Sequence, residues 1–382
     1  MELTSEQREG VQKIRFCLGD KIPAYQNTDL NLCRWWKSFG GDLEQIKHEF
    51  TNYLESRRAM GIDGVNFVQE FPTLPLRRKF HDAFLFSNVG LTLVNSKDNA
   101  IVTYQRVEGM EIKKITKKFF MSDIISVYFA LMESSLRKML QVEAKTGRPS
   151  SVVAVVDLHG LMLSEYLNPM GATVKMNKYF VHVSKLIFIN APPVITLLYQ
   201  GARLILPTHF IEKTIFLHRA EQILDYIDAD IVPVAFGGKL KDPSDWSDEP
   251  HCCNVAKPIC SSEYYQPGSI WFSLGLPEQA LNHNSVKPGK SFVVTKSVEK
   301  VGTVLAWQFW CNGDVEFGVV RVQGRKRTLV RPRFMLGTIK ISEEGSFACK
   351  EIGEYEFEFR NISSTFFAIK LQHAILTIEP EN

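Results

Sequence analysis

The order of hydrophobic and polar residues predicts helices at the start of this 382-residue chain. Between Thr28 and Met60 apolar residues recur at spacings of three and four, and the break Gly40-Gly41-Asp42 divides them into two helices. Asp29 is expected to cap the first helix, whose aromatic residues are interpreted as core. We therefore expect a helical N-terminal region over residues 1–75.

Strand and helix patterns alternate from residue 76 to residue 242. A β-rich run, Ala100–Val107, precedes a helix from Asp123 to Gly147, with Ser122 or Asp123 as its cap and the glycine as its end. The runs "SSVVAVVDLHG" (Ser150–Gly160) and "KLIFINAP" (Lys185–Pro192) are apolar almost throughout, as in strands covered on both faces. These features predict an α/β domain.

The pattern changes again towards the C-terminus. Residues 243–264 are rich in Asp, Ser and Pro without periodicity, which indicates a linker. Residues 265–382 contain short alternating strands separated by Gly, Asn and Asp turns, which is typical of an all-β sandwich. The predicted fold class is therefore multidomain, α/β plus all-β.

One predicted helix, Val194–Leu206, is apolar on almost every side. Its polar residues Thr196, Gln200 and Arg203 form one narrow stripe. The helix is too short to span a bilayer. It is either a buried core helix or a lid between an apolar cavity and a membrane surface, and the pattern fits both.

Composition narrows the function classes. The chain has 45 Lys and Arg against 42 Asp and Glu, a net charge of +3, which does not predict a nucleic-acid partner. The charged N-terminus lacks an apolar run, so we expect no secretory signal and a cytoplasmic location. Seven cysteines without a CxxC pair favour a reducing compartment, and their spacing does not predict a metal site. We expect no cofactor.

Three local motifs could carry chemistry. Asp157 and His159 are two residues apart, but no nucleophile accompanies them, so we interpret them as a turn rather than an acid and base pair. Gly237-Gly238-Lys239 lacks the spacing of a phosphate loop and is also interpreted as a turn. The segment Arg321–Arg333 has six basic residues and no acid, which predicts a hairpin that is either solvated or in contact with an anionic membrane. The candidate membrane contacts are Arg325, Lys326, Arg327, Arg331 and Arg333.

Four segments in this order resemble the CRAL-TRIO lipid-binding family: "TDLNLCRWWKSFGGDLEQIKHEFTNYLESRRAMGID", "VVAVVDLHGL", "KLIFINAP" and "VPVAFGGK". The C-terminal "WQFWCNGDVEFGVV" and "GEYEFEFRN" resemble a GOLD domain. The resemblance implies a mixed sheet, a deep apolar pocket for one lipid, and a gate helix after the "INAP" strand. The implied gate and pocket residues are Val194, Leu197, Leu198, Ala202, Ile205, Phe188, Val155, Met162 and Ser164.

The resemblance also bears on the lipid headgroup. Members that bind phosphatidylinositol carry an acid where this chain has Val181, whereas a lysine implied in phosphate binding is retained as Lys213. Phosphatidylcholine binders carry Ser-x-Ser where this chain has Met162-Leu163-Ser164. Both signatures are incomplete, so a more hydrophobic ligand competes with these phospholipids.

These observations together predict a non-enzymatic protein. We expect intracellular binding and transfer or presentation of a hydrophobic lipid (a phospholipid, a tocopherol-like molecule or another), with peripheral membrane contact and protein partners at the GOLD-like domain. The alternative is a membrane-trafficking adaptor that acts through protein binding by that domain.

Overall fold

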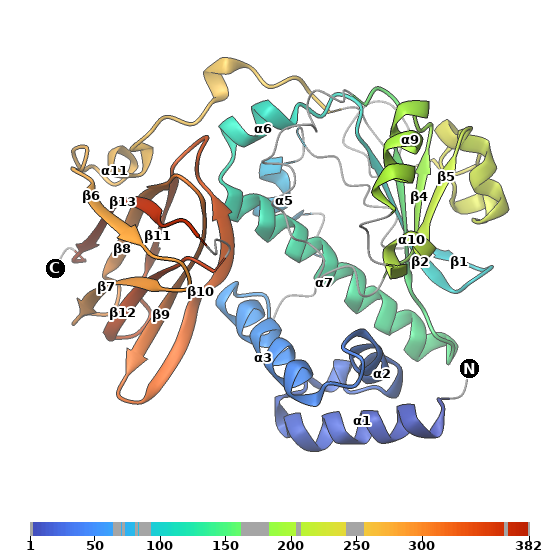
Figure 1. The fold of residues 1–382 in the computed structure, drawn as a ribbon, viewed down its shortest axis with the longest axis horizontal. Coiled ribbons are helices and arrows are strands. Elements are labelled where there is room, and N and C mark those ends of the chain that lie inside the picture. Colours follow the sequence, from blue (N-terminus) through green and yellow to red (C-terminus); the bar gives the residue numbers. More distant parts are fainter. Residues whose placement is uncertain are drawn as a thin grey trace.

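The computed structural model describes residues 3–63, 70, 73–80, 83, 93–161, 183–203, 208–241, 256–362 and 366–380 (Figure 1). Three parts follow one another along the chain: N-terminal helices, an α/β part and two C-terminal β-sheets. This order confirms the predicted fold class, while the exact boundaries at residues 75, 242 and 264 remain predictions. No single helix among the described residues is long and apolar enough to cross a membrane, although the bent pair Ile112–Lys118 and Met121–Thr146 meets the criteria of length and composition.

Up to residue 63, the described N-terminal part contains three α-helices, α1 (Ser5–Leu18), α2 (Asp29–Ser38) and α3 (Leu43–Ala59). The cap of α2 is Thr28, whose hydroxyl accepts from the backbone N–H of Asn31, so the predicted cap Asp29 is the first helical residue instead. Asp42 caps α3 in the same way. The apolar stripes of the three helices meet in one core, with Val11, Ile14, Leu32, Ile46 and Phe50 at its centre.

The α/β part is built on a five-stranded sheet in the order β1-β2-β3-β4-β5. Its strands are β1 (Val94–Asn95), β2 (Ala100–Arg106), β3 (Val152–Asp157), β4 (Val183–Ile189) and β5 (Thr214–Leu217). Strands β2 to β5 are parallel and β1 is antiparallel, so the sheet is mixed as predicted. Its helices are α5 (Pro75–Phe80), α6 (Ile112–Lys118), α7 (Met121–Thr146), α9 (Pro193–Ala202) and α10 (Thr208–Lys213).

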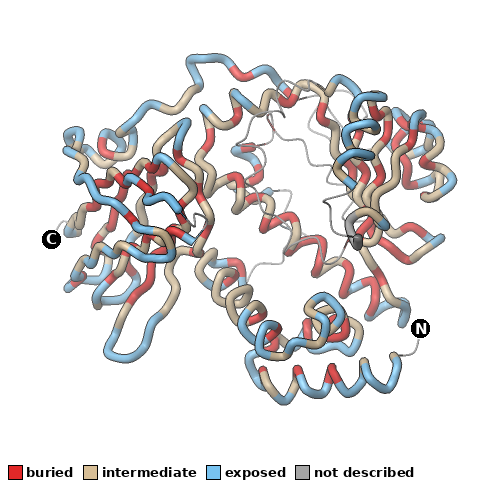
Figure 2. Tube along the Cα trace, in the orientation of Figure 1, coloured by how far each residue is buried: buried red, intermediate tan, exposed pale blue. Residues whose placement is uncertain are grey.

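The two faces of this sheet are covered by different parts of the chain. Because crossovers between sequential parallel strands are right-handed, α7 and α9 lie on one face, which we call the inner face. The opposite, outer face packs on the 3₁₀ helices η8 (Ala220–Asp225), η9 (Ala229–Ile231) and η10 (Val234–Phe236), where Ile223, Ile231, Val232 and Phe236 are buried. Figure 2 shows the buried residues along these strands and along α7.

Eight C-terminal strands form two four-stranded antiparallel sheets, in the orders β10-β9-β12-β7 and β11-β8-β13-β6. Aromatic side chains from both sheets, including Trp307, Phe309, Phe317, Phe357 and Phe359, fill one core, as in a β-sandwich. The strands are β6 (Asn282–Val286), β7 (Ser291–Val298), β8 (Val304–Cys311), β9 (Asp314–Gln323), β10 (Lys326–Gly337), β11 (Glu343–Ala348), β12 (Gly353–Arg360) and β13 (Ile369–Ile378). Short helices η1 (Gly19–Lys21), η2 (Ala24–Gln26), η11 (Ser261–Glu263) and α11 (Ser269–Ser273) complete the described elements.

The central helix α7 joins all three parts, and a buried ion-pair network holds the N-terminal helices on it. Glu133 of α7 forms ion pairs with Arg57 at 3.2 Å and with Arg137 at 2.8 Å, and it accepts a hydrogen bond from the Tyr53 hydroxyl at 2.6 Å. Arg57 is 1% exposed and Glu133 2% exposed. Because each charge is buried with its partners, loss of one partner leaves an uncompensated charge in the core.

The β-sandwich docks at the other end of α7. Glu343 of β11 accepts hydrogen bonds from the Ser122 hydroxyl and backbone N–H, in the first turn of α7. The cap residue of this helix, Phe120, makes no side-chain cap, so the sandwich supplies the acceptor that the helix end needs. The predicted caps Ser122 and Asp123 lie inside the helix, whereas Gly147 ends it with a left-handed conformation, as predicted.

The predicted linker is packed where it is described. Ala256 and Ile259 are buried in the core of the α/β part, and the backbone N–H of Ile259 donates to Glu111 at 3.1 Å. The Tyr265 N–H donates to the Lys117 carbonyl at 2.9 Å. Residues 256–265 therefore run along α6 before the sandwich begins.

Candidate functional site

The inner face of the α/β sheet carries two rows of side chains across its four parallel strands. The strand register aligns Gln105, Val156, Phe188 and Phe216 in one row, and Thr103, Ala154, Leu186 and Thr214 in the next. All eight side chains are only half-buried. No charged residue belongs to either row, so this surface is apolar with uncharged polar groups at its edges.

The outer face of the same strands is packed much more completely. Val102, Tyr104, Val155, Ile187 and Ile189 are each at most 2% exposed. Strands in the middle of a parallel sheet are ordinarily buried on both faces. The contrast means that the protein's own side chains fill the outer face and leave the inner face only partly covered.

Helix α9 follows the "INAP" segment on this inner side and has no buried residue. Its inward residues are Ile195, which packs against the core that α7 shares, and Tyr199, whose ring lies 4.8 Å from that of Phe216. The Phe216 ring in turn stacks on Phe188 at 5.0 Å. The inner face and the helix are therefore in contact through aromatic rings.

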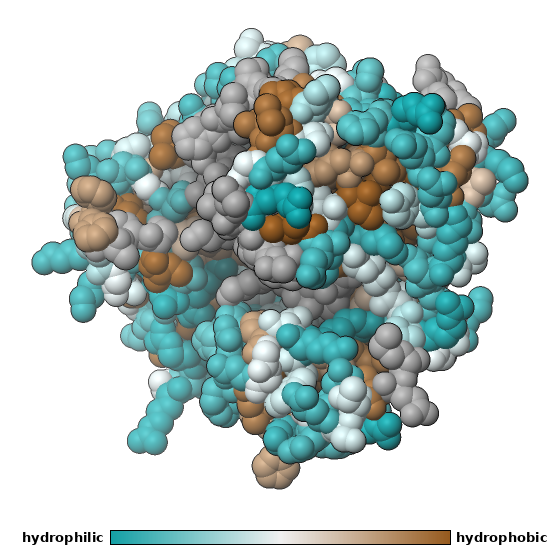
Figure 3. Space-filling model, turned by 45° about the vertical axis from the view of Figure 1, so that its right-hand side comes forward, coloured by the Kyte–Doolittle hydropathy of each residue, from teal (hydrophilic) through white to brown (hydrophobic). Residues whose placement is uncertain are grey.

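The outward side of α9 is apolar too. Val194 is 42% exposed, Leu197 67% and Leu198 52%. Hydrophobic side chains gather in the upper right-hand part of Figure 3, over the part of the molecule that holds α9. These exposed fractions contradict the alternative of a buried core helix, because a core helix would bury all three side chains.

The predicted pocket and gate residues other than Val194, Leu197 and Leu198 separate into three groups. Phe188 lies on the inner face, and Ala202 is half-buried at the end of α9. Val155 is corrected: it points to the outer face, and its neighbour Val156 takes the inward position, because successive strand residues alternate between faces. Met162, Ser164 and Ile205, together with Val181, lie outside the described residues.

Sequence reasoning missed a polar pair at the edge of the inner face. Gln105 of β2 and Tyr128 of α7 share a side-chain hydrogen bond, and burial raises the pKa of the tyrosine hydroxyl. The available signal was the alternation of β2, in which the polar Thr103 and Gln105 flank Tyr104 and follow the apolar run Ala100–Val102. The pair places an uncharged donor and acceptor beside an apolar surface.

The headgroup candidate Lys213 is the last residue of α10 and directly precedes β5. Burial lowers the pKa of its ammonium group, and no nearby acid offsets this effect among the described residues. A half-buried cation of this kind is stabilised by an anionic oxygen.

Two other motifs have structural roles. The Asp157 carboxylate accepts from the His159 backbone N–H at 3.0 Å and from the Asn190 amide at 2.8 Å, which closes the turn after β3. The His159 side chain is 64% exposed. Gly237 has φ 83°, which favours glycine, and forms the turn after η10 as predicted.

The basic segment forms the predicted hairpin, made by β9 and β10. Arg327 pairs with Glu356 and Glu358 of β12, and Arg333 pairs with Glu358 at 2.9 Å. Arg331 lies over the Trp307 ring at 5.4 Å, and burial lowers its pKa. Arg325, Lys326 and Arg331 show no ion pair with a described residue, and the first two lie at the exposed turn. The acids of β12 thus neutralise part of the cluster.

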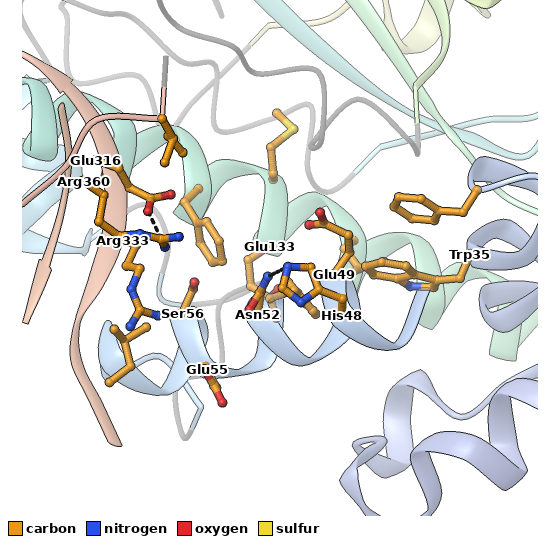
Figure 4. A pocket seen from close by; sticks show the side chains of 17 residues that line it. Trp35, His48, Glu49, Asn52, Glu55, Ser56, Glu133, Glu316, Arg333 and Arg360 are labelled. Atoms are coloured by element: carbon orange, nitrogen blue, oxygen red, sulfur yellow. Dashed lines mark hydrogen bonds and ion pairs between the residues drawn. The ribbon is translucent and has the colours of Figure 1, made fainter. Parts of the chain in front are cut away.

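A cleft of about 590 Å³ lies between α3, α7 and the sandwich (Figure 4). Arg333 and Arg360 stand at one end and Trp35 at the other, with His48, Asn52 and Glu133 between them. Its Arg360 already pairs with Glu316 at 2.7 Å. The cleft contains none of the predicted pocket residues, and both acidic and basic side chains line it.

Comparison with known proteins finds a family match for the part of the chain that contains the five-stranded sheet. Residues 90–238 match the model of the CRAL/TRIO domain. This part of the chain is a CRAL-TRIO domain. It supports lipid binding or transfer as the general activity, and CRAL-TRIO proteins are typically not enzymes.

Two curated relatives from Caenorhabditis elegans match nearly the whole chain. The CRAL-TRIO domain-containing protein C34C12.6 is 28% identical over 98% of this chain and 97% of its own length. The CRAL-TRIO domain-containing protein F28H7.8 is 20% identical over 97% of this chain and 90% of its own. Among solved structures, that of Sfh5 aligns over 72% of this chain and 98% of its own, with 12% identity and a TM-score of 0.41.

Proposed function

We propose that this protein binds one hydrophobic lipid against the inner face of its CRAL-TRIO sheet and transfers or presents it at membranes. The observation that carries the proposal is the contrast between the two faces: the outer one is filled, and the inner one keeps eight half-buried side chains. A bound acyl chain or ring system would bury this surface, at about 25 cal/mol for each Å² of apolar area removed from water.

Helix α9 is the gate in this proposal. Its inward residues Ile195 and Tyr199 face the sheet side, and its outward Leu197 and Leu198 are exposed to solvent. When such a helix moves from the inner face of the sheet to a bilayer surface, its apolar side chains remain in an apolar environment. Opening the lid, rather than extracting the lipid into water, would then determine the rate of transfer.

The polar groups favour a ligand with one hydrogen-bonding head. Gln105 and Tyr128 offer an uncharged donor and acceptor, while Lys213 offers a cation. An uncharged lipid with a hydroxyl or carbonyl group would use the first pair, and a phospholipid would use the lysine. We propose the C-terminal sandwich as a GOLD-like domain that positions the chain at its membrane.

Two adjacent substitutions on β3 test the pocket. Ala154→Phe enlarges an inward side chain, so we expect lipid uptake to fall at least about tenfold with little change in the free energy of unfolding. Val155→Phe enlarges a side chain in the filled outer face, so it should destabilise the protein by about 1–3 kcal/mol through overpacking. Native mass spectrometry after incubation with liposomes measures the uptake.

The outcomes separate the two hypotheses. If Ala154→Phe destabilises the chain as much as Val155→Phe does, the inner face is already packed and the pocket is rejected. A wild-type protein that takes up no lipid from any liposome would instead favour the alternative, an adaptor that works through its sandwich.

A further inference from the structure

One end of the β-sandwich exposes aromatic side chains beside lysines. Phe366 and Phe367, which lie between β12 and β13, are 84% and 78% exposed, and Ile362, which also lines the cleft beside α3, is 51% exposed. Lys287 and Lys290, in the turn between β6 and β7, are also exposed. We call these five residues the sandwich tip.

The sandwich tip is held in place by a buried asparagine. Asn361 is 0% exposed, and its side-chain amide donates to the Val286 carbonyl at 2.9 Å and to the Phe367 carbonyl at 3.0 Å. Its backbone carbonyl accepts from Gly289 at 2.8 Å, and its N–H donates to Lys290 at 3.0 Å. The two segments are therefore fixed to one another, and the exposed rings are presented from an ordered base.

The charge around these rings is positive. Residues 284–290 and 361–371 contain Lys287, Lys290 and Lys370 and no acidic residue. Lys370 lies in β13 opposite Ser285 and is exposed. No ion pair joins any of the three lysines to an acid in the described part of the chain.

We propose that the sandwich tip inserts into the surface of an anionic bilayer. Aromatic rings favour the membrane interface, and neighbouring lysines are attracted to anionic headgroups. A protein partner is less well matched, because lysine is depleted from protein interfaces. Among the predicted membrane contacts, Arg327 and Arg333 already pair with acids of β12, whereas Arg325 and Lys326 are exposed at the separate turn between β9 and β10.

The inference concerns the membrane that the proposed function requires, and it does not depend on the lipid pocket. The test uses the full chain and sedimentation with phosphatidylcholine vesicles that contain or lack phosphatidylserine. Phe366→Ser with Phe367→Ser should reduce binding to the anionic vesicles at least about tenfold. Lys287→Glu with Lys290→Glu should abolish the preference for phosphatidylserine and its dependence on salt.

Phe16→Ser is the matched control, because Phe16 is 94% exposed on α1, in the N-terminal part of the chain. It removes an equally exposed ring and should leave vesicle binding unchanged. Equal effects of Phe16→Ser and the double Phe variant would overturn the proposal. So would a double variant that keeps vesicle binding and instead loses a protein partner.

Native mass spectrometry of the same variants keeps this result separate from the pocket. We expect the double Phe variant to retain as much bound lipid as the wild type, with an unchanged circular dichroism spectrum. If vesicle binding falls only because the fold is lost, a direct contact with the membrane is contradicted. In that case Phe366→Leu, which keeps an apolar side chain, should also fail to restore binding.

Discussion

Glu343 shows how one carboxyl group can couple folding to pH. Burial raises its pKa to about 8, with a further rise from Asp123, while Ser122 and Arg331 act in the opposite direction. The folded protein therefore keeps this proton up to about pH 8, whereas the unfolded chain releases it near pH 4.5. The folded state binds more protons in this window. The stability that the protonated Glu343 contributes is therefore complete below pH 4.5 and is lost as the pH rises to 8.

Glu343→Gln should remove this dependence on pH. The amide cannot ionise. Between pH 5 and pH 8 the free energy of unfolding of the variant should therefore fall by about 3 kcal/mol less than that of the wild type. Urea unfolding at a series of pH values measures the decline in both proteins. The same slope in wild type and variant would show that Glu343 titrates normally in the folded state.

The neighbouring residues Arg57 and Arg58 offer a matched pair for the buried network. Arg57→Ala should cost about 3 kcal/mol, because it leaves Glu133 buried with fewer counter-charges. The Arg58 side chain is 68% exposed, so Arg58→Ala should change stability by less than about 0.5 kcal/mol. Thermal unfolding of the two variants is the measurement. Similar losses would mean that the buried Arg57–Glu133 ion pair stabilises the protein no more than the exposed Arg58 side chain does.

At the level of single residues, the sequence predicts the pocket strand but not its face. The run Val152–Val156 is apolar at every position, so alternation cannot show which residues point inward. The strand register, which places Val156 beside Phe188, shows that Val156 points to the inner face. Gln105 and Tyr128 lie 23 residues apart on a strand and a helix, and only tertiary packing brings them together.

At the level of elements, the strands β2, β3 and β4 and the end of α7 at Gly147 agree with the sequence pattern. Helix α1 was missed, although Thr4 and Gln7 form a capping box and Val11, Ile14 and Leu18 form its buried stripe. Strand β6 was also missed, because an edge strand with four exposed residues lacks an apolar face. Its pairing with β13 is a non-local contact that the local pattern does not contain.

Helix α9 is the element whose two sides can be tested separately. Leu198 is exposed, so Leu198→Asp should change the free energy of unfolding by less than about 0.5 kcal/mol, yet slow lipid exchange with vesicles about tenfold. Ile195 packs inward, so Ile195→Asp should reduce both stability and the amount of bound lipid. Transfer of a fluorescent lipid between vesicles measures the exchange. If Leu198→Asp exchanges lipid at the wild-type rate, the hypothesis that α9 contacts the membrane is rejected.

At the level of the whole molecule, the sandwich and the CRAL-TRIO domain share α7 as a common support. Blue N-terminal helices, the green α/β part and the orange sandwich surround this helix in Figure 1. Met60, Met121 and Ile125 pack against the sandwich core, and Glu343 meets the start of α7. A movement of the sandwich would therefore act on α7, which carries Tyr128 beside the inner face.

Two adjacent residues of α7 separate docking from folding. Ile125 packs on the sandwich core, whereas Ile124 is 6% exposed in the core of the α/β part. Ile125→Asp should release the sandwich with both folds intact, because the charge enters only their interface. Ile124→Asp should unfold the α/β part, at a cost of several kcal/mol.

Small-angle X-ray scattering and calorimetry distinguish these outcomes. For Ile125→Asp we expect a larger radius of gyration and two unfolding transitions where the wild type has one, since the parts no longer stabilise each other. If its bound lipid then exchanges faster than in the wild type, the docked sandwich restrains the gate through α7. An unchanged radius and a single transition would show that the interface tolerates the charge, and that Met60, Met121 and Glu343 are sufficient to hold the sandwich on the helix.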